Sequence, residues 1–495
     1  MADVVVVGGS IAGLSAALTL SRSGHSVTVV ERDDTPMPNS PDEAFEWDRR
    51  GAPQVRHSHA FLARLYTTLR DRYPDVLADL LDAGASEIRF GADLPPTIAD
   101  FVPMADDDDV VMLACRRTTF EWVLRRAVLR SPVVTIRTGV GVEGFVTSPD
   151  DTAPDDTSPD GSTRRPPRID GVRLSSAEVL TADLVVVASG RRGDLGSWLG
   201  AIGVDSMLET TEDTGIVYLS RFYRLLPGAD FPPRAGPIGG DLGYIKYGVF
   251  SGDNRTFSVT LAIPTADAEL RRLLVEPETF DRCGRRLVAT APWLDGRATP
   301  ITDGVHAMAG LINRLRTLTV DGDPIVRGMH PVGDALVCTN PLYGRGCSTA
   351  LWGAQLLADA IAANPDDLDA QSRSYLATVD AQIVPWYRAS VNQDLEAQRV
   401  AAALLAGEDP DADRSDSRTF LRGVLRDGLA PAMRTDAVVL RAVFRNFNLL
   451  TPPDALLSDT DVSARVLAAW NDRENRPPEP RLGPASRTDL LAVIN

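Results

Sequence analysis

The chain has 495 residues, of which 44% are hydrophobic and 24% are charged, and its formal net charge is −17. A chain of this length is too long for one hydrophobic core, so we expect two or three domains. The acidic balance argues against nucleic acid or an anionic membrane as the main partner, because both repel a negative surface. Four cysteines without a C-x-x-C motif, and the lack of an apolar run long enough to cross a bilayer, predict a cytoplasmic protein without a membrane span.

The start of the chain alternates apolar runs with a glycine-rich turn. Four β-branched residues, Val4–Val7, predict a buried parallel strand, and a second strand is expected at Val27–Val30. Between them, the turn Gly8–Gly13 leads directly into a helix expected at Leu14–Ser21. Glu31 closes the second strand where an acid accepts hydrogen bonds from an adenosine ribose. This order of elements predicts a dinucleotide-binding site.

Each residue type in the turn has its own physical reason. Gly8 permits the tight turn, and Gly13 lets the helix lie close to the strand. The amides at the helix start, at Ile11 and Ala12, face a pyrophosphate without needing a side chain. Ser10 replaces the middle glycine of the G-x-G-x-x-G pattern, and we expect it to be tolerated because its hydroxyl can donate to a phosphate oxygen.

The next segment, GAPQVRHSHAFL, holds two histidines of the five in the chain. Pro53–His59 are expected to be extended and Ala60–Arg70 to be helical. A metal pair of His57 and His59 is the weakest interpretation, because no third ligand lies at a useful spacing, and no metal site is expected. Two interpretations of this stretch remain open: it faces a ligand or cofactor, or it has a surface or capping role.

Charged residues flank the next predicted strand and helix. The acidic run Asp106–Asp109 predicts a solvated hairpin tip. Arg116 and Arg117 stand just before a helix whose inward residues run from Phe120 to Val128. Spacing alone does not decide whether these arginines clamp a phosphate or are surface charges.

Residues 133–180 leave the predicted sheet and form short alternating strands. They are separated by a spacer, Ser148–Pro167, of Pro, Asp, Ser and Thr with almost no apolar residue. Such a composition predicts a disordered hairpin loop. A buried strand returns in TADLVVVASGRR, residues 181–192, so the sheet of the first domain resumes there.

Residues 205–320 predict an antiparallel sheet with one wetted face, because GIVYLSRFYRL, GYIKYGVF and TFSVTLAIP alternate in polarity. Such an inserted sheet is a natural wall for a substrate pocket. Four aromatic residues belong either to that wall or to the core of the sheet: Phe222, Tyr244, Tyr247 and Phe250.

A second glycine-rich stretch spans residues 328–361. Gly333 and Asp334 follow a predicted strand, a proline-glycine turn occupies Asn340–Gly346, and a helix is expected at Ser348–Ile361. An acid at a strand end can bind a sugar-like hydroxyl chain, and a helix start offers amides and a positive dipole to an electron-rich ring. Beyond Pro365, helices are expected at 368–405, 419–448 and 462–471.

Together these motifs resemble the FAD-dependent monooxygenases of the para-hydroxybenzoate hydroxylase fold. The resemblance rests on the glycine turn with Glu31, on Arg117 before its helix, on DLVVVASGRR and on VGD…NPLYGRG, and it covers nearly residues 1–400. Within that superfamily, GAPQVRHSHAFL, ADLVVVASGRRGDLGSWLGAIGV and NPLYGRGCSTA are most similar to actinobacterial polyether epoxidases and, more distantly, to squalene epoxidase.

The resemblance implies an α/β fold with three parts. A Rossmann-like FAD-binding domain comprises residues 1–204, with the β excursion at 133–180, and returns at 321–364. An inserted antiparallel β-sheet substrate domain occupies 205–320. A C-terminal helical region follows at 365–495.

The resemblance also implies how FAD is held. The glycine turn and Glu31 would hold the ADP half, while Arg117 and Asp334 would hold the pyrophosphate and the ribityl chain. Pro341 and the amides of 344–347 would border the isoalloxazine. The residues expected to bind the cofactor are Gly8, Ser10, Ile11, Ala12, Gly13, Glu31, Arg32, Arg56, Arg117, Ser189, Gly190, Gly333, Asp334, Gly344, Gly346 and Cys347. His57, His59 and Pro341 are the candidates for a direct part in catalysis.

The implied reaction inserts one oxygen atom of O2, through a flavin C4a-hydroperoxide, into a hydrophobic natural product. Epoxidation of an alkene is favoured because it needs no base to deprotonate the substrate, and only His57 and His59 are candidates for a base. Two alternatives stay open: aromatic hydroxylation, and a flavin-dependent dehydrogenase or reductase of an isoprenoid or polyketide chain.

Two departures from related motifs bear on reduction and halogenation. Ser189-Gly190 stands where the hydroxylases have an Asp-Gly pair implicated in FAD and NADPH binding, so reducing equivalents from NAD(P)H are expected through a separate flavin reductase. Flavin halogenases share the fold but have a W-x-W-x-I-P pattern and an active-site lysine. Here no two tryptophans are two apart, and the single lysine, Lys246, lies in the predicted substrate sheet, so halogenation is not expected.

Overall fold

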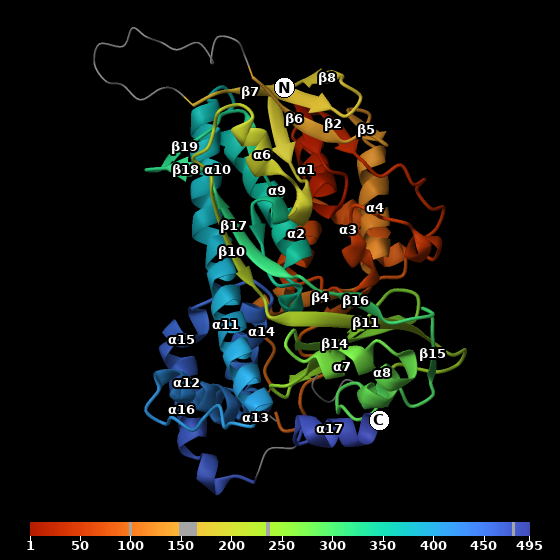
Figure 1. Ribbon diagram of the computed structural model, residues 1–495, viewed down its shortest axis with the longest axis vertical. Helices are drawn as coiled ribbons and strands as arrows, with labels where there is room; N and C mark the ends of the chain where they lie inside the picture. The colour runs from red at the N-terminus through yellow and green to blue at the C-terminus, as the bar shows by residue number, and fades with distance from the viewer. Residues whose placement is uncertain (99–100, 148–165, 234–237, 478–480) are drawn as a thin grey trace.

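The computed structural model describes residues 1–98, 101–147, 166–233, 238–477 and 481–495. The upper part of the molecule in Figure 1 is built on a parallel sheet with the strand order β20-β9-β1-β2-β5. Its strands are β1 (Asp3–Val7), β2 (Ser26–Glu31), β5 (Val134–Thr138), β9 (Leu184–Val187) and β20 (Met329–Pro331). The apolar runs of β1 and β9 are buried because both strands are central and covered on both faces. The expected return of the chain to this sheet is confirmed by the pairing of Val4 with Leu184.

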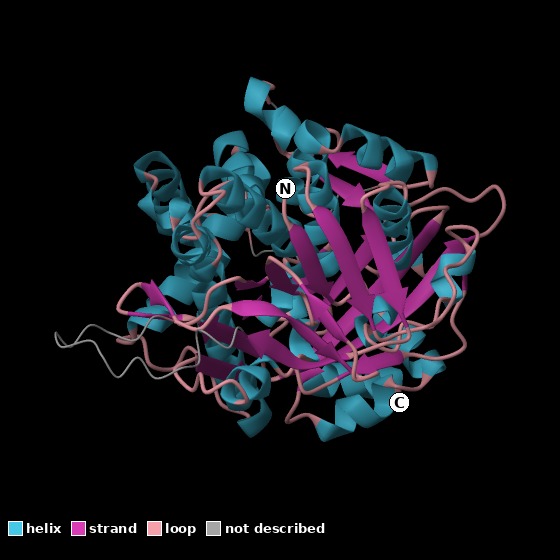
Figure 2. Cartoon of the chain, turned by 90° about the horizontal axis from the view of Figure 1, so that it is seen from above, coloured by secondary structure: helices cyan, strands magenta, loops and turns pink. Residues whose placement is uncertain are grey.

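Helices cover the parallel sheet. They are α1 (Ile11–Arg22), α2 (Ala63–Arg72), α3 (Pro74–Asp82), α4 (Arg117–Leu129), α6 (Leu195–Gly200) and α9 (Gly346–Ala363). α1 packs against α9 and α4, and Figure 2 shows helices around the strands. The segment expected to be extended at Pro53–His59 differs, because Pro53–Arg56 form a 3-10 turn, η2.

Three small sheets border this core. β3 (Ser86–Arg89) pairs with β4 (Val111–Ala114). β6 (Val142–Thr147), β7 (Ile169–Leu174) and β8 (Val179–Thr181) form the expected excursion. The hairpin loop predicted at Ser148–Pro167 lies outside the described residues at 148–165. β18 (Thr319–Val320) pairs with β19 (Asp323–Pro324).

The expected antiparallel sheet forms the lower layer, in the order β12-β13-β14-β11-β15, and β16 also pairs with β11. Its strands are β11 (Ile216–Leu225), β12 (Gly239–Asp241), β13 (Lys246–Ser251), β14 (Thr256–Pro264), β15 (Ala298–Pro300) and β16 (His306–Met308). The prediction of a wetted face is wrong for β11 and β14, which are buried along almost their whole length. Three helices cover one face: α7 (Ala268–Leu274), α8 (Pro277–Gly284) and α17 (Arg487–Ile494). The other face lies against the part built on the parallel sheet, so its polar residues face that part instead of water.

A further sheet and two long helices join the layers. The sheet contains β10 (Leu208–Asp213), β17 (Ile312–Thr317) and β21 (Val337–Cys338). α10 (Leu368–Gln382) and α11 (Val384–Ala406) run down one side of the molecule (Figure 1). The single helix expected at 368–405 is broken between them, just before Pro385, because proline cannot donate the helical hydrogen bond.

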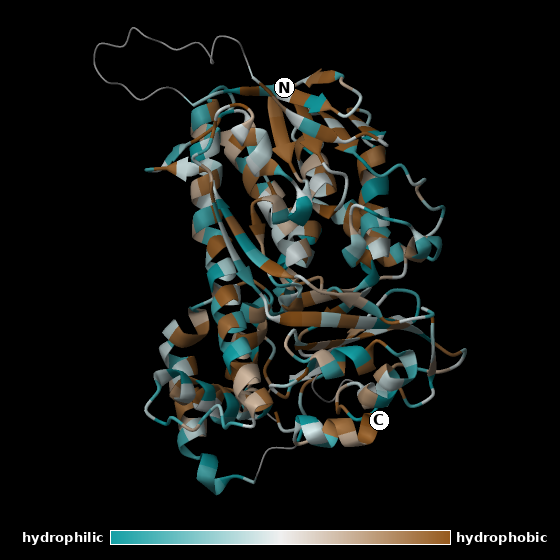
Figure 3. Ribbon diagram, in the orientation of Figure 1, coloured by the Kyte–Doolittle hydropathy of each residue, from teal (hydrophilic) through white to brown (hydrophobic). Residues whose placement is uncertain are grey.

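The C-terminal helices form a separate cluster beside the lower end of α11 (Figure 1). They are α12 (Ser417–Val424), α13 (Ala430–Thr435), α14 (Ala437–Phe447), α15 (Ala455–Ser458) and α16 (Thr460–Asn471). The helix expected at 419–448 is interrupted by a π-helical turn at Leu425–Leu429 and again at Asp436. Figure 3 shows that hydrophobic residues concentrate on interior strands such as β11, while the helices carry mixed faces. In the described part of the chain, no helix combines the length and apolarity that crossing a membrane requires.

The acidic run 106–109 lies in the connection between the paired strands β3 and β4, but only part of it is solvated. It forms a 3-10 turn, η3 (Ala105–Asp109), in which Asp107 is buried. Both oxygens of Asp107 accept hydrogen bonds from Arg441 of α14, at 2.6 and 3.0 Å. The partner lies more than three hundred residues away, so the run also anchors the C-terminal cluster.

Candidate functional site

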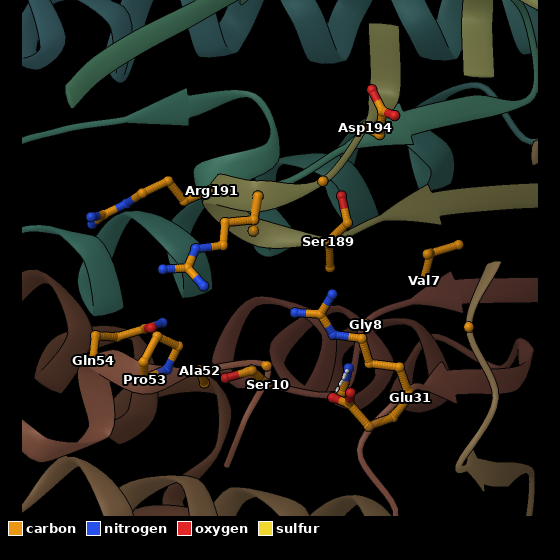
Figure 4. A pocket seen from close by; sticks show the side chains of 18 of the residues that line it. Val7, Gly8, Ser10, Glu31, Ala52, Pro53, Gln54, Ser189, Arg191 and Asp194 are labelled. Atoms are coloured by element: carbon orange, nitrogen blue, oxygen red, sulfur yellow. Dashed lines mark hydrogen bonds between the residues drawn. The ribbon is translucent and has the colours of Figure 1, made fainter. Parts of the chain in front are cut away.

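A cleft of about 700 Å³ opens at the carboxyl ends of β1, β2 and β9. Ser10 and Glu31 lie on one wall, and Ser189 and Arg191 lie on the facing wall (Figure 4). Residues 51–57 and 306–310 close its sides. Ligands of open α/β sheets bind at this edge, outside the carboxyl ends of the strands.

The glycine turn at this cleft leaves no room for side chains at two positions. Gly8 has a φ of +108°, and a Cβ there would lie 2.5 Å from the Ala188 carbonyl oxygen. A Cβ on Gly13 would lie 1.8 Å from the Gly8 carbonyl oxygen. The backbone of the first turn of α1 therefore lies directly against the backbone of the strand end. The first amides of α1 lack partners within the helix, and they follow Ser10, which lines the cleft.

A buried cluster of charges lies behind the turn. Arg49 donates to Glu121 at 2.7 Å, to Asp33 at 3.0 Å and to Glu31 at 3.2 Å. Its side chain is 2% exposed, and those of the three carboxylates are 1–7% exposed. Glu31 also accepts the amide of Gly9 at 2.9 Å. The cluster therefore fixes both the turn and the acid at the end of β2.

Arg117 is the second cation of this cluster. Its guanidinium lies 2.8 Å from Glu121 and donates to Ser10 Oγ at 2.8 Å. Ser10 Oγ donates its only hydrogen to Glu121 at 2.9 Å, so the hydroxyl expected to face a phosphate is used within the protein. Burial alone would raise the pKa of Glu121, but Arg117 and Arg49 outweigh it and hold that pKa below its usual value. The carboxylate therefore stays charged.

Arg116 has a different role from its neighbour. It forms an ion pair of 2.6 Å with Asp253, whose side chain is completely buried in the turn between β13 and β14. Thr119 donates to the same carboxylate at 2.9 Å. Neither of the two interpretations from the sequence applies to Arg116, which joins α4 to the antiparallel sheet.

The structure brings part of the expected cofactor set together around the cleft. The lining residues of that set are Gly8, Ser10, Glu31, Arg32, Arg56, Ser189 and Gly190, and His57 lines the cleft as well. Ile11, Ala12 and Gly13 lie in the first turn of α1. Gly333, Asp334, Gly344, Gly346 and Cys347 do not line it and instead follow β20 or stand at the start of α9.

The composition of the cleft fits FAD. Ser189 Oγ is buried and has no hydrogen-bond partner among the described residues, so a polar ligand would satisfy it. The amides at the start of α1 suit a pyrophosphate. Gly333, with a φ of +59°, packs against α1, because a Cβ there would lie 2.9 Å from the Ala12 Cβ. The strand end that carries Asp334 therefore lies beside the glycine turn.

A short 3-10 turn, η7 (Pro341–Tyr343), precedes α9 and ends at Gly344. The resemblance implies that this segment borders the isoalloxazine, and after that expectation we call residues 341–344 the flavin turn. Asp394 of α11 holds it from behind, because its buried carboxylate accepts hydrogen bonds from Asn340 at 2.8 Å, Tyr343 at 2.7 Å and Asn313 at 2.6 Å. Burial raises the pKa of Asp394, and these donors counteract part of that rise. The sequence contains no local sign of this contact.

Cys347 stands in the first turn of α9 and is buried. Burial raises the pKa of its thiol to about 12. At neutral pH the side chain is therefore a thiol rather than a reactive thiolate.

A second cavity, of about 320 Å³, separates the flavin turn from the antiparallel sheet. We call it the sheet cavity. Its lining includes Ala60, Tyr218, Lys246, Gly248, Phe250, Thr260, Ala262, Pro341, Leu342, Gly344 and Phe447. Phe250 is thus in the wall as expected, whereas Tyr244 and the ring of Tyr247 belong to the core on the other face of the sheet.

Three cross-strand rows form the floor facing the flavin turn. The first contains Asp241, Lys246, Ala262 and Tyr218; the second, Gly239, Gly248, Thr260, Ser220 and His306; the third, Phe250, Ser258 and Phe222. Side chains two apart along a strand share a face, so hydroxyls form the middle of this floor and aromatic rings flank them.

A chain of hydroxyl groups runs along this floor to His57. His57 Nδ1 lies 3.1 Å from Ser220 Oγ, which lies 3.0 Å from Thr260 Oγ1. Thr260 Oγ1 in turn lies 2.6 Å from Ser58 Oγ. His57 lines the cleft, while Ser58 and Thr260 line the sheet cavity, so the chain connects the two. The alternation of these strands predicts a wetted face, whereas their hydroxyls form a buried connection.

Both histidines of this segment are neutral at physiological pH. Burial lowers the pKa of His57 to about 3, with smaller effects from His306 and Arg191. Burial also lowers the pKa of His59 to about 3, and Arg117 adds to the effect. His59 Nδ1 lies 2.9 Å from the His57 carbonyl oxygen, so a neutral ring that donates this hydrogen bond fixes its orientation.

Solved structures of flavin enzymes share this architecture. p-Nitrophenol 4-monooxygenase PnpA from Pseudomonas putida DLL-E4 matches with a TM-score of 0.59 at 18% identity, over 91% of this chain and 99% of that one. PqsL, a probable FAD-dependent monooxygenase from Pseudomonas aeruginosa, matches with 0.55 at 19% identity, over 83% and 97%. The myxobacterial chondrochloren halogenase CndH matches with 0.56 at 16% identity, over 94% and 97%. At these identities the likeness establishes the fold.

The fold and the cleft define an FAD-dependent oxidoreductase. The family model "FAD dependent oxidoreductase" matches residues 3–44, which hold β1, the glycine turn and Glu31. Protein Rv3254 from Mycobacterium tuberculosis (strain ATCC 25618 / H37Rv) is 30% identical over 375 residues, which are 69% of each chain. The chain belongs to the family of that protein. The expectations of the fold class and of FAD are therefore confirmed.

Proposed function

We propose that this oxidoreductase is a monooxygenase that transfers one atom of O2 to a hydrophobic small molecule, and that the reaction is the epoxidation of an alkene. The sheet cavity carries the proposal, because it borders the flavin turn and its walls are largely apolar. A volume of about 320 Å³ falls within the range of small-molecule sites. The fold shared with PnpA and PqsL supports the same class of reaction.

In this proposal the cleft residues hold the ADP half of FAD and the flavin turn borders its isoalloxazine. The amides of the glycine turn bind the pyrophosphate, Glu31 binds the adenosine ribose, and Asp334 binds the ribityl chain. The start of α9, at Gly346 and Cys347, carries the positive end of the helix dipole and would stabilise negative charge on a ring bound beside it. Bound and reduced FAD supplies the activation of O2.

The remaining residues of the sheet cavity exclude water and orient the substrate. Phe250, Leu342 and Phe447 present apolar surface around the space next to the flavin turn. A dry site prevents hydrolysis and proton leakage before oxygen reaches the substrate. Asp394 keeps the turn in place from behind, so the substrate and the cofactor face each other at a fixed separation.

The protonation state of the histidines favours an alkene as substrate. His57 and His59, with pKa values near 3, are weak bases at neutral pH. Deprotonating a phenol requires a base whose pKa lies close to the working pH, whereas an alkene needs none. For the source of electrons, we propose a separate flavin reductase that uses NAD(P)H, because Ser189 replaces an acid of the hydroxylase motif.

Aromatic hydroxylation is the second candidate, and the hydroxyl chain favours it. The chain from Ser58 and Thr260 through Ser220 to His57 links the sheet cavity to the cleft by contacts of 2.6–3.1 Å. Hydroxyl groups in such a row can each pass on a proton while accepting another. A phenolic substrate in the cavity could therefore pass its proton along this chain of hydroxyls, which ends at the neutral ring of His57.

The test uses the full-length protein loaded with FAD, a flavin reductase, NADPH and 18O2. The substrates are linear and cyclic isoprenoid alkenes, polyketide alkenes, and phenols matched in carbon number. We expect one 18O atom in an epoxide product, with no conversion by a Gly13→Ala variant that lacks the flavin. An 18O-labelled phenol product would assign aromatic hydroxylation instead.

Two results contradict the proposal. Conversion that continues under nitrogen, without 18O in the product, would make the protein a dehydrogenase or reductase. A purified protein that binds no FAD would remove the basis of the whole scheme.

The role of the reductase is tested by adding NADPH alone, because direct reduction of the bound flavin within one catalytic cycle would show that no second protein is needed.

A further inference from the structure

The sheet cavity carries one ammonium group, that of Lys246, on a floor that also holds the carboxylate of Asp241 and is otherwise apolar or hydroxylated. We propose that Lys246 forms an anion subsite that selects hydrophobic substrates carrying an acidic oxygen, a carboxylate or a phenolate. This inference rests on the proposed function, since it assigns the substrate class of the same cavity. It does not depend on which bond receives the oxygen atom.

The register of the sheet directs Lys246 into the cavity. Lys246 lies opposite Ala262 on β14 and Asp241 on β12, and Ala262 lies opposite Tyr218 on β11. Because cross-strand neighbours share a face, Lys246 stands on the side of Tyr218 and of the flavin turn. Its side chain is 24% exposed, which is low for a lysine and means that it is partly desolvated.

The positive charge of Lys246 also acts on Asp394, the residue that supports the flavin turn. Burial raises the pKa of Asp394, and the positive charge of Lys246 counteracts part of that rise. Asp394 accepts a hydrogen bond from Tyr343, which lines the cavity. Lys246 and Tyr343 line the same cavity, so the ammonium can fix one end of a substrate there.

Space for a ligand lies next to the ammonium. Gly239 and Gly248 oppose each other across β12 and β13, one row beyond Lys246. The Phe250 ring folds over this row, because a Cβ at Gly248 would lie 3.2 Å from it. Leu342 and Phe447 lie on other sides of the cavity. The arrangement suits an amphipathic molecule with its acidic end at Lys246 and its apolar part against Phe250.

Asp241 is the competitor for the same ammonium. Its carboxylate lies 2.7 Å from Lys246 Nζ, but it is 54% exposed and can be hydrated when a ligand displaces it. An ammonium has three donors, and this contact uses one of them. The plainer explanation is a cross-strand ion pair that only supports the sheet. The two explanations predict opposite effects for Asp241, which makes them separable.

The first measurement compares two probes that differ by one anionic group. The probe 8-anilino-1-naphthalenesulfonate is a hydrophobic anion, and N-phenyl-1-naphthylamine is its neutral counterpart. With the FAD-loaded protein, we expect Lys246→Met to weaken binding of the anion about tenfold or more, the size of a lost charged hydrogen bond. Binding of the neutral probe should change less than about twofold, and Lys246→Arg, the matched control, should retain the preference for the anion.

Asp241→Asn separates the subsite from a structural ion pair. If Asp241 competes with the ligand, removing its charge strengthens binding of the anionic probe. If the pair only supports the sheet, Asp241→Asn and Lys246→Met break the same contact and weaken both probes alike. That second result would overturn the proposal, as would anion binding that Lys246→Met leaves unchanged.

The single lysine of the chain provides a direct readout of occupancy. After acetylation by acetic anhydride, fragmentation of the peptide that contains residue 246 separates an acetyl group on the lysine amine from one on the neighbouring Tyr244 or Tyr247. A saturating anionic probe should slow the acetylation of Lys246 by about tenfold, and equal rates with and without the probe would refute the subsite. Neither assay needs turnover. A protected lysine without oxygen transfer would therefore contradict the proposed function and leave the subsite standing.

Discussion

Arg49 offers the sharpest test of the charge cluster behind the glycine turn. The change Arg49→Met keeps most of the side-chain volume and removes the cation that contacts Glu31, Asp33 and Glu121 at 2.7–3.2 Å. All four side chains are at most 7% exposed, so water does not replace the lost charge. Removing one partner of a buried pair costs about 3–5 kcal/mol, and we expect the free energy of unfolding to fall by about that amount at pH 7.

The loss should depend on pH in a defined direction. Arg49 and Arg117 hold the pKa of Glu121 below its usual value of 4.5, so this carboxylate stabilises the fold above that pH and loses its contribution as the pH falls through the lowered pKa. In the Arg49→Met variant the negative charge of Glu121 has lost one of its two cationic partners. Protonating Glu121 therefore recovers part of the lost free energy of unfolding. The difference between the wild type and the variant should therefore be largest near pH 7 and shrink below about pH 5.

Urea unfolding followed by circular dichroism measures both effects, with FAD release recorded in parallel. Arg50→Met is the matched control, because Arg50 is the next residue, its side chain is 82% exposed and its partner Asp48 is exposed as well. We expect no measurable change for that variant. A loss below about 1 kcal/mol for Arg49→Met, or a loss that is independent of pH, would refute the reasoning.

Three further predictions follow from single contacts. Gly13→Ala should abolish FAD binding, because its Cβ would lie 1.8 Å from a carbonyl oxygen. Gly144→Ala, the control, should retain the flavin, because a Cβ there meets nothing within 4 Å. The flavin absorbance of the purified proteins tests both outcomes. Asp394→Ala should lower turnover with little loss of FAD, because three donors lose their acceptor at the flavin turn, and equal turnover would contradict its role. Asp253→Asn should lower the unfolding free energy by about 3–5 kcal/mol, because it removes the fully buried carboxylate that pairs with Arg116 and leaves only Asp42, which is 56% exposed; a value near zero in urea unfolding would contradict this.

Local patterns account for the parts of the fold that the sequence predicts. Four consecutive β-branched residues in β1, the glycine turn and the start of α1 depend on neighbours within a few residues. Periodicity also identifies the antiparallel strands, but not what covers them. The hydroxyls of β14, Ser258 and Thr260, alternate as they would on a wetted face. Only the packing of Ser58 against them turns that face into the lining of a cavity.

Contacts between distant residues account for what the sequence does not predict. Arg49 lies in a polar, proline-rich stretch, and its partner Glu121 is 72 residues away. Asp394 reaches Asn340 and Asn313 across 54 and 81 residues. Asp394 is one of many carboxylates on helices, and nothing in the residues around it marks its side chain as buried. The order of the sheets in space, which no periodic pattern encodes, determines these pairs.

The last helix of the chain has a consequence for biosynthesis. Leu490 and Ile494 of α17 are fully buried in the core of the antiparallel layer, beside Phe280 and Leu270. That layer is translated long before α17, and at 5–20 residues per second the delay is about 10–40 s. During this interval α7 and α8 cover the face without α17, so the apolar contacts that Leu490 and Ile494 complete in this core are missing. The parallel sheet must wait as well, since β20 also follows the layer in translation order.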